Sequence, residues 1–338
     1  MDNVAVFVGL DYHQAFVQVC VMDRQGQRLG NRECANDWQA ITRYVARFGS
    51  RVQAAMESCA GAADLCDELT TRAGWSVDLA HPGFVARMKQ NPDKTDFQDA
   101  HLLADLERVG YLPRVWLAPQ PVRELRQLVR YRQQLVEQRR STKLRMRALL
   151  RDQRCAAPPG VNAWTCAWKT WLEKEADLSA QGRWIMGKHV QELDRLAQAI
   201  QEVEKRLAEA TAEDPEVAHL QELRGIGPVT AWTLRAEIGR FDRFRSGKQL
   251  SRFCGLSPRN ASSGNRQADA GLMRMANPQL RAVLIEAAHR LARCDEKWRS
   301  LALRLRNAGK PGSVTAAAVA NRWVRWVFHQ MQPIAAVA

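Results

Sequence analysis

The chain has 338 residues, with 50 Lys and Arg against 36 Asp and Glu, which gives a formal net charge of +14. Hydrophobic residues make up 46% of it, so global disorder is excluded. No uncharged apolar run reaches the roughly 18 residues of a membrane span, and the eight cysteines form no C-x-x-C pair typical of zinc frameworks. We therefore expect two or three domains in a cytoplasmic protein with reduced thiols and no membrane partner.

The positive charge is concentrated in two blocks. Residues 121–154 hold 11 basic and 3 acidic side chains, and residues 223–310 hold 18 and 6. Blocks of this kind are the electrostatic footprint of a polyanion binder, and most of the cations are arginines, which can fork onto phosphate oxygens. A merely solvated basic surface is the alternative.

The N-terminal third alternates strand and helix patterns. Apolar runs predict strands at 4–10, 15–22, 27–34, 52–56 and 75–80, and helical spacing predicts helices at 38–48, 61–73 and 95–109. The order β-β-β-α-β-α-β-α indicates an α/β domain with a mixed sheet flanked by helices. We assign residues 1–112 to it.

A proline-punctuated linker then leads into a long helix predicted over residues 122–154. A seven-residue spacing aligns four arginines along this helix, and we expect them to bind nucleic-acid phosphates. They are Arg126, Arg140, Arg147 and Arg154.

The segment after Pro158-Pro159-Gly160 predicts further helices. Trp164, Trp168 and Trp171 share a helix face there, which favours packing over base stacking. The a/d-like spacing of apolar residues over 183–212 predicts a coiled-coil arm. We assign residues 113–215 to the linker and this arm.

Residues 216–338 predict a mostly helical domain, interrupted by a Gly/Ser/Asn-rich loop at 255–271. Gly225 and Gly227 in Leu223–Ala231 fit a helix-hairpin-helix, in which backbone N–H groups approach a DNA phosphate. A plain glycine turn between helices is the alternative. No G-x-x-x-x-G-K-[ST] sequence occurs, so we expect no nucleotide cofactor.

Four carboxylates occupy positions that the predicted fold brings together. Asp11 follows the first strand and Glu57 closes the fourth, while Asp96 and Asp99 share a helix face at i and i+3. If these strands are neighbours, a helix packed across their ends completes a cluster that repels itself unless cations occupy it. We predict a Mg²⁺ or Mn²⁺ site, suited to clamping the oxygens of a phosphodiester.

The element order and these acids resemble the ribonuclease-H-like nucleases, most closely the Holliday-junction-resolvase (RuvC-like) branch. The sequences Val8-Gly-Leu-Asp11, Met56-Glu57-Ser58 and Lys94-Thr-Asp96-Phe-Gln-Asp99-Ala are similar to the DEDD transposases of the "one-ten" family of insertion sequences. The resemblance continues through Gly255-Leu-Ser-Pro258-Arg259 and a following Ser-Gly pair. It departs at Met273-Arg274-Met275-Ala276, where Arg274 keeps a cation.

The resemblance implies a transposase that cuts and rejoins DNA in the bacterial cytosol. From composition alone, Ser263 before Gly264 is an ordinary loop residue, but the resemblance assigns it as the nucleophile that links covalently to DNA. It also implies that the four acids are catalytic metal ligands and that the active site is composite, formed between subunits of a dimer or tetramer. A structured "bridge" RNA is implied as the guide of the enzyme to its DNA. The further nucleic-acid contacts that we expect in this region are Arg259, Arg266 and Arg274.

Two rival functions remain open. One is a structure-selective or RNA-cutting nuclease that uses metal-activated water and no serine, and the other is a non-catalytic nucleic-acid-binding scaffold. A tyrosine recombinase is weaker, because all four tyrosines precede the C-terminal domain. Ser246-Gly247 lies upstream of the family signature, so we do not assign it as the nucleophile.

Overall fold

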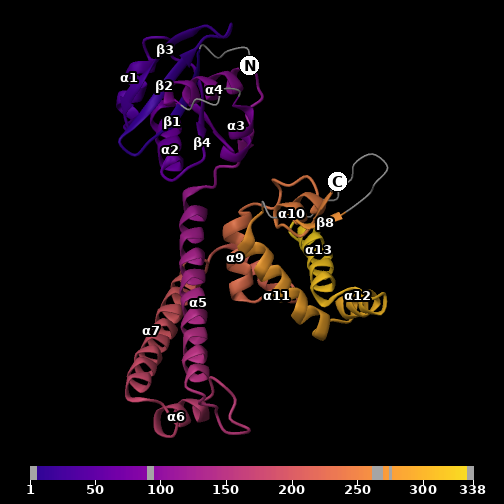
Figure 1. Ribbon diagram of the computed structural model, residues 1–338. Helices are drawn as coiled ribbons and strands as arrows, with labels where there is room; N and C mark the ends of the chain where they lie inside the picture. The colour runs from indigo at the N-terminus through magenta and orange to yellow at the C-terminus, as the bar shows by residue number, and fades with distance from the viewer. Residues whose placement is uncertain (1–5, 90–94, 261–268, 274–275, 333–338) are drawn as a thin grey trace. The chain divides into compact units, whose positions relative to one another are not determined.

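The computed structural model describes residues 6–89, 95–260, 269–273 and 276–332. It divides the chain into two compact units, Met1–Ala118 and Pro119–Ala338, shown in Figure 1. No helix of the described residues has the length and apolar character needed to cross a membrane.

The first unit is built on a six-stranded mixed sheet with the order β3-β2-β1-β4-β5-β6. The central strand β1 pairs antiparallel with β2 and parallel with β4, so the predicted mixed sheet is confirmed and strands one and four are neighbours. The strands are β1 Val6–Tyr12, β2 Phe16–Met22, β3 Arg28–Ala35, β4 Val52–Glu57, β5 Ser76–Ala80 and β6 Arg114–Val115.

Alternate residues of the central strands face opposite layers of helices. Val8 and Leu10 of β1 belong to a core with residues of α1 (Trp38–Val45) and α2 (Ala62–Ala73). On the other face, residues of β2, β4 and β5 pack with α3 (Pro82–Met88) and α4 (Asp96–Arg108). Because strand side chains alternate with a period of two, odd-numbered residues of β1 and β4 face α4.

A glycine in β1 sets how closely α4 approaches the sheet. A Cβ atom on Gly9 would overlap the backbone carbonyl of Ala100 and lie 2.6 Å from the backbone nitrogen of Ala104. Only glycine therefore permits the helix to lie this close to the strand. The approach brings the first turn of α4 toward the carboxyl end of β1.

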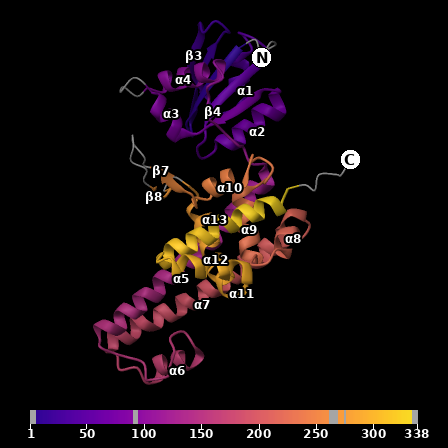
Figure 2. The same cartoon turned by 90° about the vertical axis from the view of Figure 1, so that its right-hand side faces the viewer.

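The second unit begins with two long helices that run antiparallel. α5 (Gln120–Asp152) and α7 (Ala180–Ala210) pack side by side along their length, as Figure 2 also shows. The helix α6 (Cys166–Lys174) lies where α5 ends and α7 begins. Its Trp168 and Trp171 are buried there with residues of α5 and α7. The prediction that the tryptophans serve packing is confirmed, since Trp164 packs against the same cluster. The prediction that all three share a helix face was wrong, because Trp164 lies before α6 with a φ of +74°.

The remaining helices share one core with the N-terminal part of α5 and the C-terminal part of α7. Residues of α5 and α7 pack in a single hydrophobic cluster with α8, α9, α10, α11, α12 and α13. The arm and the C-terminal region, expected as separate domains, thus belong to one compact unit. The bounds are α8 Pro215–Glu222, α9 Pro228–Ile238, α10 Gly247–Phe253, α11 Pro278–Cys294, α12 Glu296–Asn307 and α13 Gly312–Gln330.

The segment expected as a loop at 255–271 contains two short strands. β7 (Pro258–Asn260) and β8 (Asp269–Leu272) pair antiparallel, with Pro258 opposite Leu272. The expectation of a purely irregular loop was wrong at these positions. The residues between the strands, 261–268, lie outside the described part of the chain.

Candidate active site

Two of the predicted acids lie side by side at the edge where parallel strands end. Leu10 of β1 is paired with Met56 of β4, so the next residues, Asp11 and Glu57, occupy neighbouring positions. Both are odd-numbered residues, so both lie on the face of the sheet that α4 covers. Gln53 of β4, which shares that parity, donates a hydrogen bond of 2.8 Å to the Glu107 carboxylate of α4.

The other two acids lie in the first turn of α4. Thr95 caps the helix, its side chain accepting from the backbone N–H of Gln98. The cap starts the helix at Asp96, and i, i+3 spacing sets Asp96 and Asp99 on one face. The positive end of the helix dipole favours anions at this turn.

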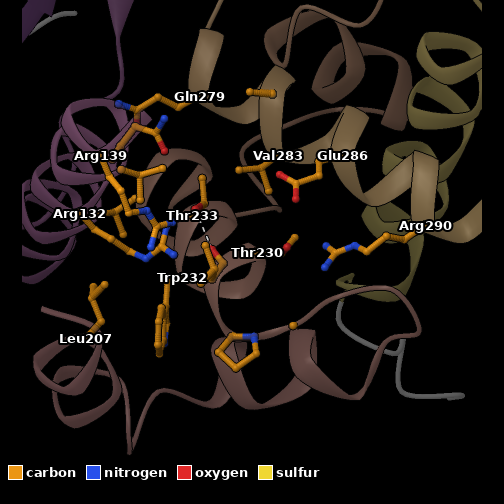
Figure 3. A pocket seen from close by; sticks show the side chains of 17 residues that line it. Arg132, Arg139, Leu207, Thr230, Trp232, Thr233, Gln279, Val283, Glu286 and Arg290 are labelled. Carbon is orange, nitrogen blue, oxygen red and sulfur yellow. Dashed lines mark hydrogen bonds between the residues drawn. The ribbon is translucent and has the colours of Figure 1, made fainter. Parts of the chain in front are cut away.

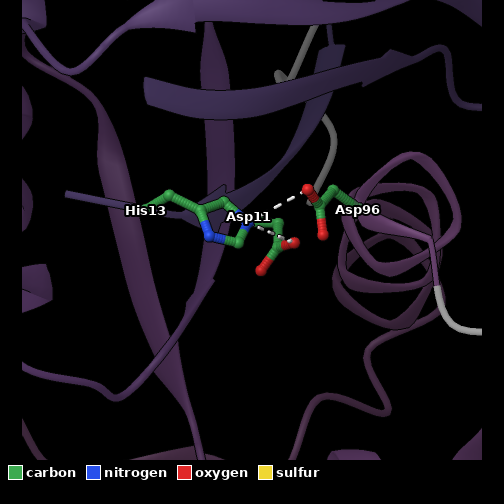
Figure 4. A group of neighbouring side chains, drawn as sticks. All are labelled: Asp11, His13 and Asp96. Carbon is green, nitrogen blue, oxygen red and sulfur yellow. Dashed lines mark hydrogen bonds and ion pairs between the residues drawn. The ribbon is translucent and has the colours of Figure 1, made fainter. Parts of the chain in front are cut away.

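The end of β1 and the start of α4 bring Asp11 and Asp96, which are 85 residues apart in sequence, together with His13. His13 Nε2 lies 3.3 Å from Asp11 Oδ2 and 3.3 Å from Asp96 Oδ2 (Figure 4). One ligand atom from each of the three residues lies within 4.8 Å of the others. The arrangement places two carboxylates and an imidazole around a common point.

The electrostatics of the cluster fit a bound cation. Burial raises the pKa of Asp11 above its ordinary value, and the carboxylates of Asp99 and Asp96 raise it further, while His13 lowers it. Burial also raises the pKa of the Cys59 thiol, to which the charges of Glu57 and Asp11 add. Carboxylates that destabilise each other's charge are a donor set for divalent ions with oxygen ligands.

Lys89 already supplies one cation to this cluster. Its Nζ lies 2.7 Å from Asp99 Oδ1, and the Asp99 side chain is only 10% exposed. An ammonium group at this distance neutralises part of the charge that a divalent ion would otherwise balance. Lys89 and His13 are the members of the site that the sequence analysis missed.

The predicted arginine stripe divides into two environments. Arg140 and Arg147 are exposed on α5, whereas Arg154 lies beyond the helix with a φ of +52°. Arg126 is different, because its Nε donates to the Ala236 carbonyl at 3.0 Å and its side chain is 24% exposed. Arg126 therefore ties α5 to α9, and its role as a phosphate contact stays a prediction from the sequence.

The glycine motif forms the turn between α8 and α9. Gly225 has a φ of +93°, a conformation that favours glycine, and Gly227 is the residue before the first turn of α9. A cleft of about 440 Å³ takes in Gly227 and lies between α5, α9 and α11. Figure 3 shows Arg132 and Arg139 on one side of it and Arg290 on the other.

The predicted serine and two of its basic neighbours cannot be placed. Ser263, Arg266 and Arg274 lie outside the described residues. Arg259 is exposed in β7. Ser246 caps α10, accepting from the backbone N–H of Gln249, which gives that serine a structural role.

Comparisons with known proteins agree with this organisation. A DEDD transposase family, described as "Transposase", matches residues 8–153, and the "Transposase IS116/IS110/IS902 family" matches residues 217–303. A "Probable family 20 transposase" of Pseudomonas aeruginosa is 29% identical over 94% of both chains. The transposase for insertion sequence element IS1111A of Coxiella burnetii is 25% identical over 85% of this chain and 78% of its own.

The third relative extends the same pattern. The transposase for insertion sequence element IS1328 of Yersinia enterocolitica is 24% identical over 85% of this chain and 84% of its own. Together with the fold, these matches define a transposase, an enzyme that cleaves and rejoins DNA. The chain belongs to the IS116/IS110/IS902 family of insertion-sequence transposases, and the resemblance drawn from its sequence motifs is confirmed.

Proposed function

We propose that the first unit is a ribonuclease-H-like, RuvC-like catalytic domain whose four acids hold divalent ions for DNA strand cleavage. The observation that carries this proposal is the convergence of Asp11, Asp96 and Asp99, with Glu57 beside Asp11 in strand register. Mg²⁺ or Mn²⁺ held there would stabilise the charge that builds up on the phosphoryl oxygens. The carboxylates fix the position of that charge relative to the sheet.

Ser263 is the proposed nucleophile. Its Oγ forms a bond to phosphorus as the bond from phosphorus to the leaving sugar oxygen breaks, and that oxygen takes up a proton to become a free hydroxyl. A hydroxyl of the strand to be joined then attacks the phosphoserine, forms the new phosphodiester and releases the serine. One phosphodiester is exchanged for another, so the reaction needs no nucleotide cofactor.

We further propose that the active site is composite. Acids of one protomer act with Ser263 of another, so the working enzyme is a dimer or tetramer. The helix pair α5–α7, predicted as a coiled-coil arm, is the proposed contact between protomers. This part of the proposal comes from the family resemblance.

The nucleic-acid partners proposed are the DNA ends of the element and a structured guide RNA. Exposed Arg140 and Arg147 on α5 support a phosphate-binding surface, as does the start of α9 at Gly227, which lines a cleft together with Arg132, Arg139 and Arg290. Arg154, Gly225 and Arg259 extend the set, and Arg266 and Arg274 stay predictions from the sequence.

A covalent-adduct assay tests the mechanism. Wild-type protein is incubated with element-end DNA, guide RNA and Mg²⁺, and the protein–DNA adduct is measured on a denaturing gel. We expect an adduct with the wild type, and at least a hundredfold loss in Asp11→Asn and in Ser263→Ala. Ser246→Ala is the matched serine control and should form the adduct.

The rivals give different results in the same assay. If Ser263→Ala still cuts the DNA at the wild-type rate, the protein is a hydrolytic nuclease that uses water. If Asp11→Asn retains full cleavage and joining, the acids are incidental and the metal-dependent mechanism is wrong.

A further inference from the structure

His13 follows the first strand and is held in place by its surroundings. Its backbone N–H donates to the Phe16 carbonyl at 2.9 Å across the turn between β1 and β2. Its ring stacks on the Phe16 ring, with centroids 4.6 Å apart and an interplanar angle of 25°. The hydrogen bond fixes the backbone of His13, and the stacking restrains its ring.

The held ring directs one nitrogen toward two of the acids. Nε2 lies at equal distances of 3.3 Å from Asp11 Oδ2 and Asp96 Oδ2, as Figure 4 shows. Asp11 and Asp96 come from different elements, so the histidine bridges the strand end and the helix start. A ring nitrogen of imidazole can carry only one hydrogen, so Nε2 cannot donate fully to both oxygens at once.

The spacing of these atoms matches that of ligands around one ion. Ligands at about 2.1 Å from an ion lie about 3.0 Å apart at a right angle and about 3.4 Å apart at a tetrahedral angle. The two nitrogen–oxygen separations of 3.3 Å fall in this interval. The side chain of His13 is 37% exposed and that of Asp11 16%, so the point between them is open to an ion from solvent.

We propose that His13 Nε2 is a direct metal ligand alongside Asp11 and Asp96, and that it shifts the site toward transition-metal ions relative to Mg²⁺. This inference rests on the proposed function, which supplies the divalent ion but assigns only oxygen ligands. Imidazole binds first-row transition ions well, whereas Mg²⁺ prefers oxygen ligands and keeps its water. His13 thereby determines which ion the enzyme uses.

Mn²⁺ is the probe that detects the nitrogen directly. The full-length, metal-free protein is titrated with Mn²⁺ alone, and electron spin echo envelope modulation is recorded on the bound ion. We expect ¹⁴N modulation from a coordinated imidazole in the wild type and its loss in His13→Ala and His13→Gln. His189→Ala, a histidine substitution on α7, is the matched control and should keep the modulation.

Calorimetry provides the second readout. His13→Ala is expected to weaken Mn²⁺ binding by about tenfold or more while changing Mg²⁺ binding less, and His13→Gln to lower the Mn²⁺/Mg²⁺ preference by substituting an oxygen ligand. Mn²⁺ that binds without His13-dependent ¹⁴N modulation overturns this inference and leaves the proposed function standing. Failure of the wild type to bind Mn²⁺ at all overturns both.

Discussion

Single side chains determine the chemistry at the carboxyl end of β1. Four carboxylates supply negative charge there: Asp11 from β1, Glu57 from the neighbouring strand β4, and Asp96 and Asp99 from the first turn of α4. The ammonium group of Lys89 neutralises part of this charge by pairing with Asp99. In the proposed metal site, the balance between these acids and one ammonium group sets how strongly a divalent ion would be held. In that site the ammonium group of Lys89 would compete with the ion for Asp99.

Removing that ammonium group should strengthen metal binding. We expect Lys89→Met to lower the dissociation constant for Mn²⁺ by about threefold to thirtyfold, because a cation 2.7 Å from Asp99 no longer competes with the ion. Calorimetric titration measures it, with Lys205→Met on α7 as the control. Weaker Mn²⁺ binding in Lys89→Met would show that the lysine supports the ion instead of opposing it.

The acids could be predicted from the sequence, but their other partners could not. Asp11 lies one residue before the end of β1 and Glu57 ends β4, and Asp96 and Asp99 have helical spacing after a threonine cap, so local patterns suffice. His13 reaches the site through the turn before β2, and Lys89 through the end of α3. The position of His13 depends on the geometry of that turn. The position of Lys89 depends on α3, a helix that the pattern of apolar residues did not predict.

At the scale of elements, the site exists because α4 lies against β1 over a glycine. Gly9 leaves room for the Ala100 carbonyl, and Ala100 and Ala104 present small side chains to β2. The first turn of α4, with Asp96 and Asp99, is positioned by this contact. A larger residue at position 9 must move the helix.

Gly9→Ala should therefore impair the site without unfolding the chain. We expect it to destabilise the first unit by about 1–3 kcal/mol through overpacking and to weaken Mn²⁺ binding at least tenfold, since α4 is pushed from the strand. Circular dichroism and calorimetry measure the two effects. Gly187→Ala on α7, where a Cβ meets open space, is the control; unchanged Mn²⁺ binding in Gly9→Ala would disprove the role of this contact.

A buried carboxylate joins three elements of the second unit. Glu237 of α9 is 2% exposed and accepts from Arg130 of α5 at 2.8 and 3.0 Å and from Asn277, the cap of α11, at 2.6 Å. Arg126 Nε lies 3.7 Å from the same carboxylate. This cluster fixes α5 to the C-terminal helices.

Loss of that carboxylate should destabilise the unit strongly. Glu237→Ala leaves the half-buried Arg126 without its counter-charge, and we expect a loss of about 3–5 kcal/mol in the free energy of unfolding of the second unit. Denaturant unfolding followed by circular dichroism measures it. Glu192→Ala on α7, which removes a surface ion pair with Arg195, should change little. An equally small effect of Glu237→Ala would contradict the structural role.

Most elements followed from hydrophobic patterning, and the exceptions have physical reasons. The strands β1 to β5 and the helices α1, α2 and α4 fall within a few residues of their predicted positions, because one buried face imposes a clear period. The two-residue strand β6 and the helix α3 were not predicted. The helix α3 is only seven residues long and begins at Pro82. The strands β7 and β8 pair mainly through backbone groups in a Gly/Ser/Asn-rich segment, where side-chain patterning carries no signal.

On the scale of the whole molecule, the net charge of +14 makes polyanion binding the dominant long-range interaction. Much of this charge lies in α5 and the C-terminal helices, away in sequence from the acidic cluster. Cations that neutralise phosphates release counterions, so their contribution is visible in the salt dependence of binding. The arginines that pair inside the protein should not contribute to it.

The double variant Arg140→Ala/Arg147→Ala tests whether the exposed arginines of α5 neutralise phosphates. We expect it to reduce the slope of log K against log[salt] for guide-RNA binding by about two, roughly one for each phosphate that an arginine no longer neutralises. Fluorescence anisotropy across a salt series measures the slope. Arg195→Ala, an exposed arginine paired with Glu192, is the control; a slope equal to the wild type would remove α5 from the binding surface.

Anomalous diffraction from crystals of the full-length protein grown with Mn²⁺ tests the proposed metal centre most directly. We predict an anomalous peak at about 2.0–2.3 Å from carboxylate oxygens drawn from Asp11, Glu57, Asp96 and Asp99, and its disappearance in Asp11→Asn crystals. A structure saturated with Mn²⁺ in which no ion contacts these oxygens would contradict the account.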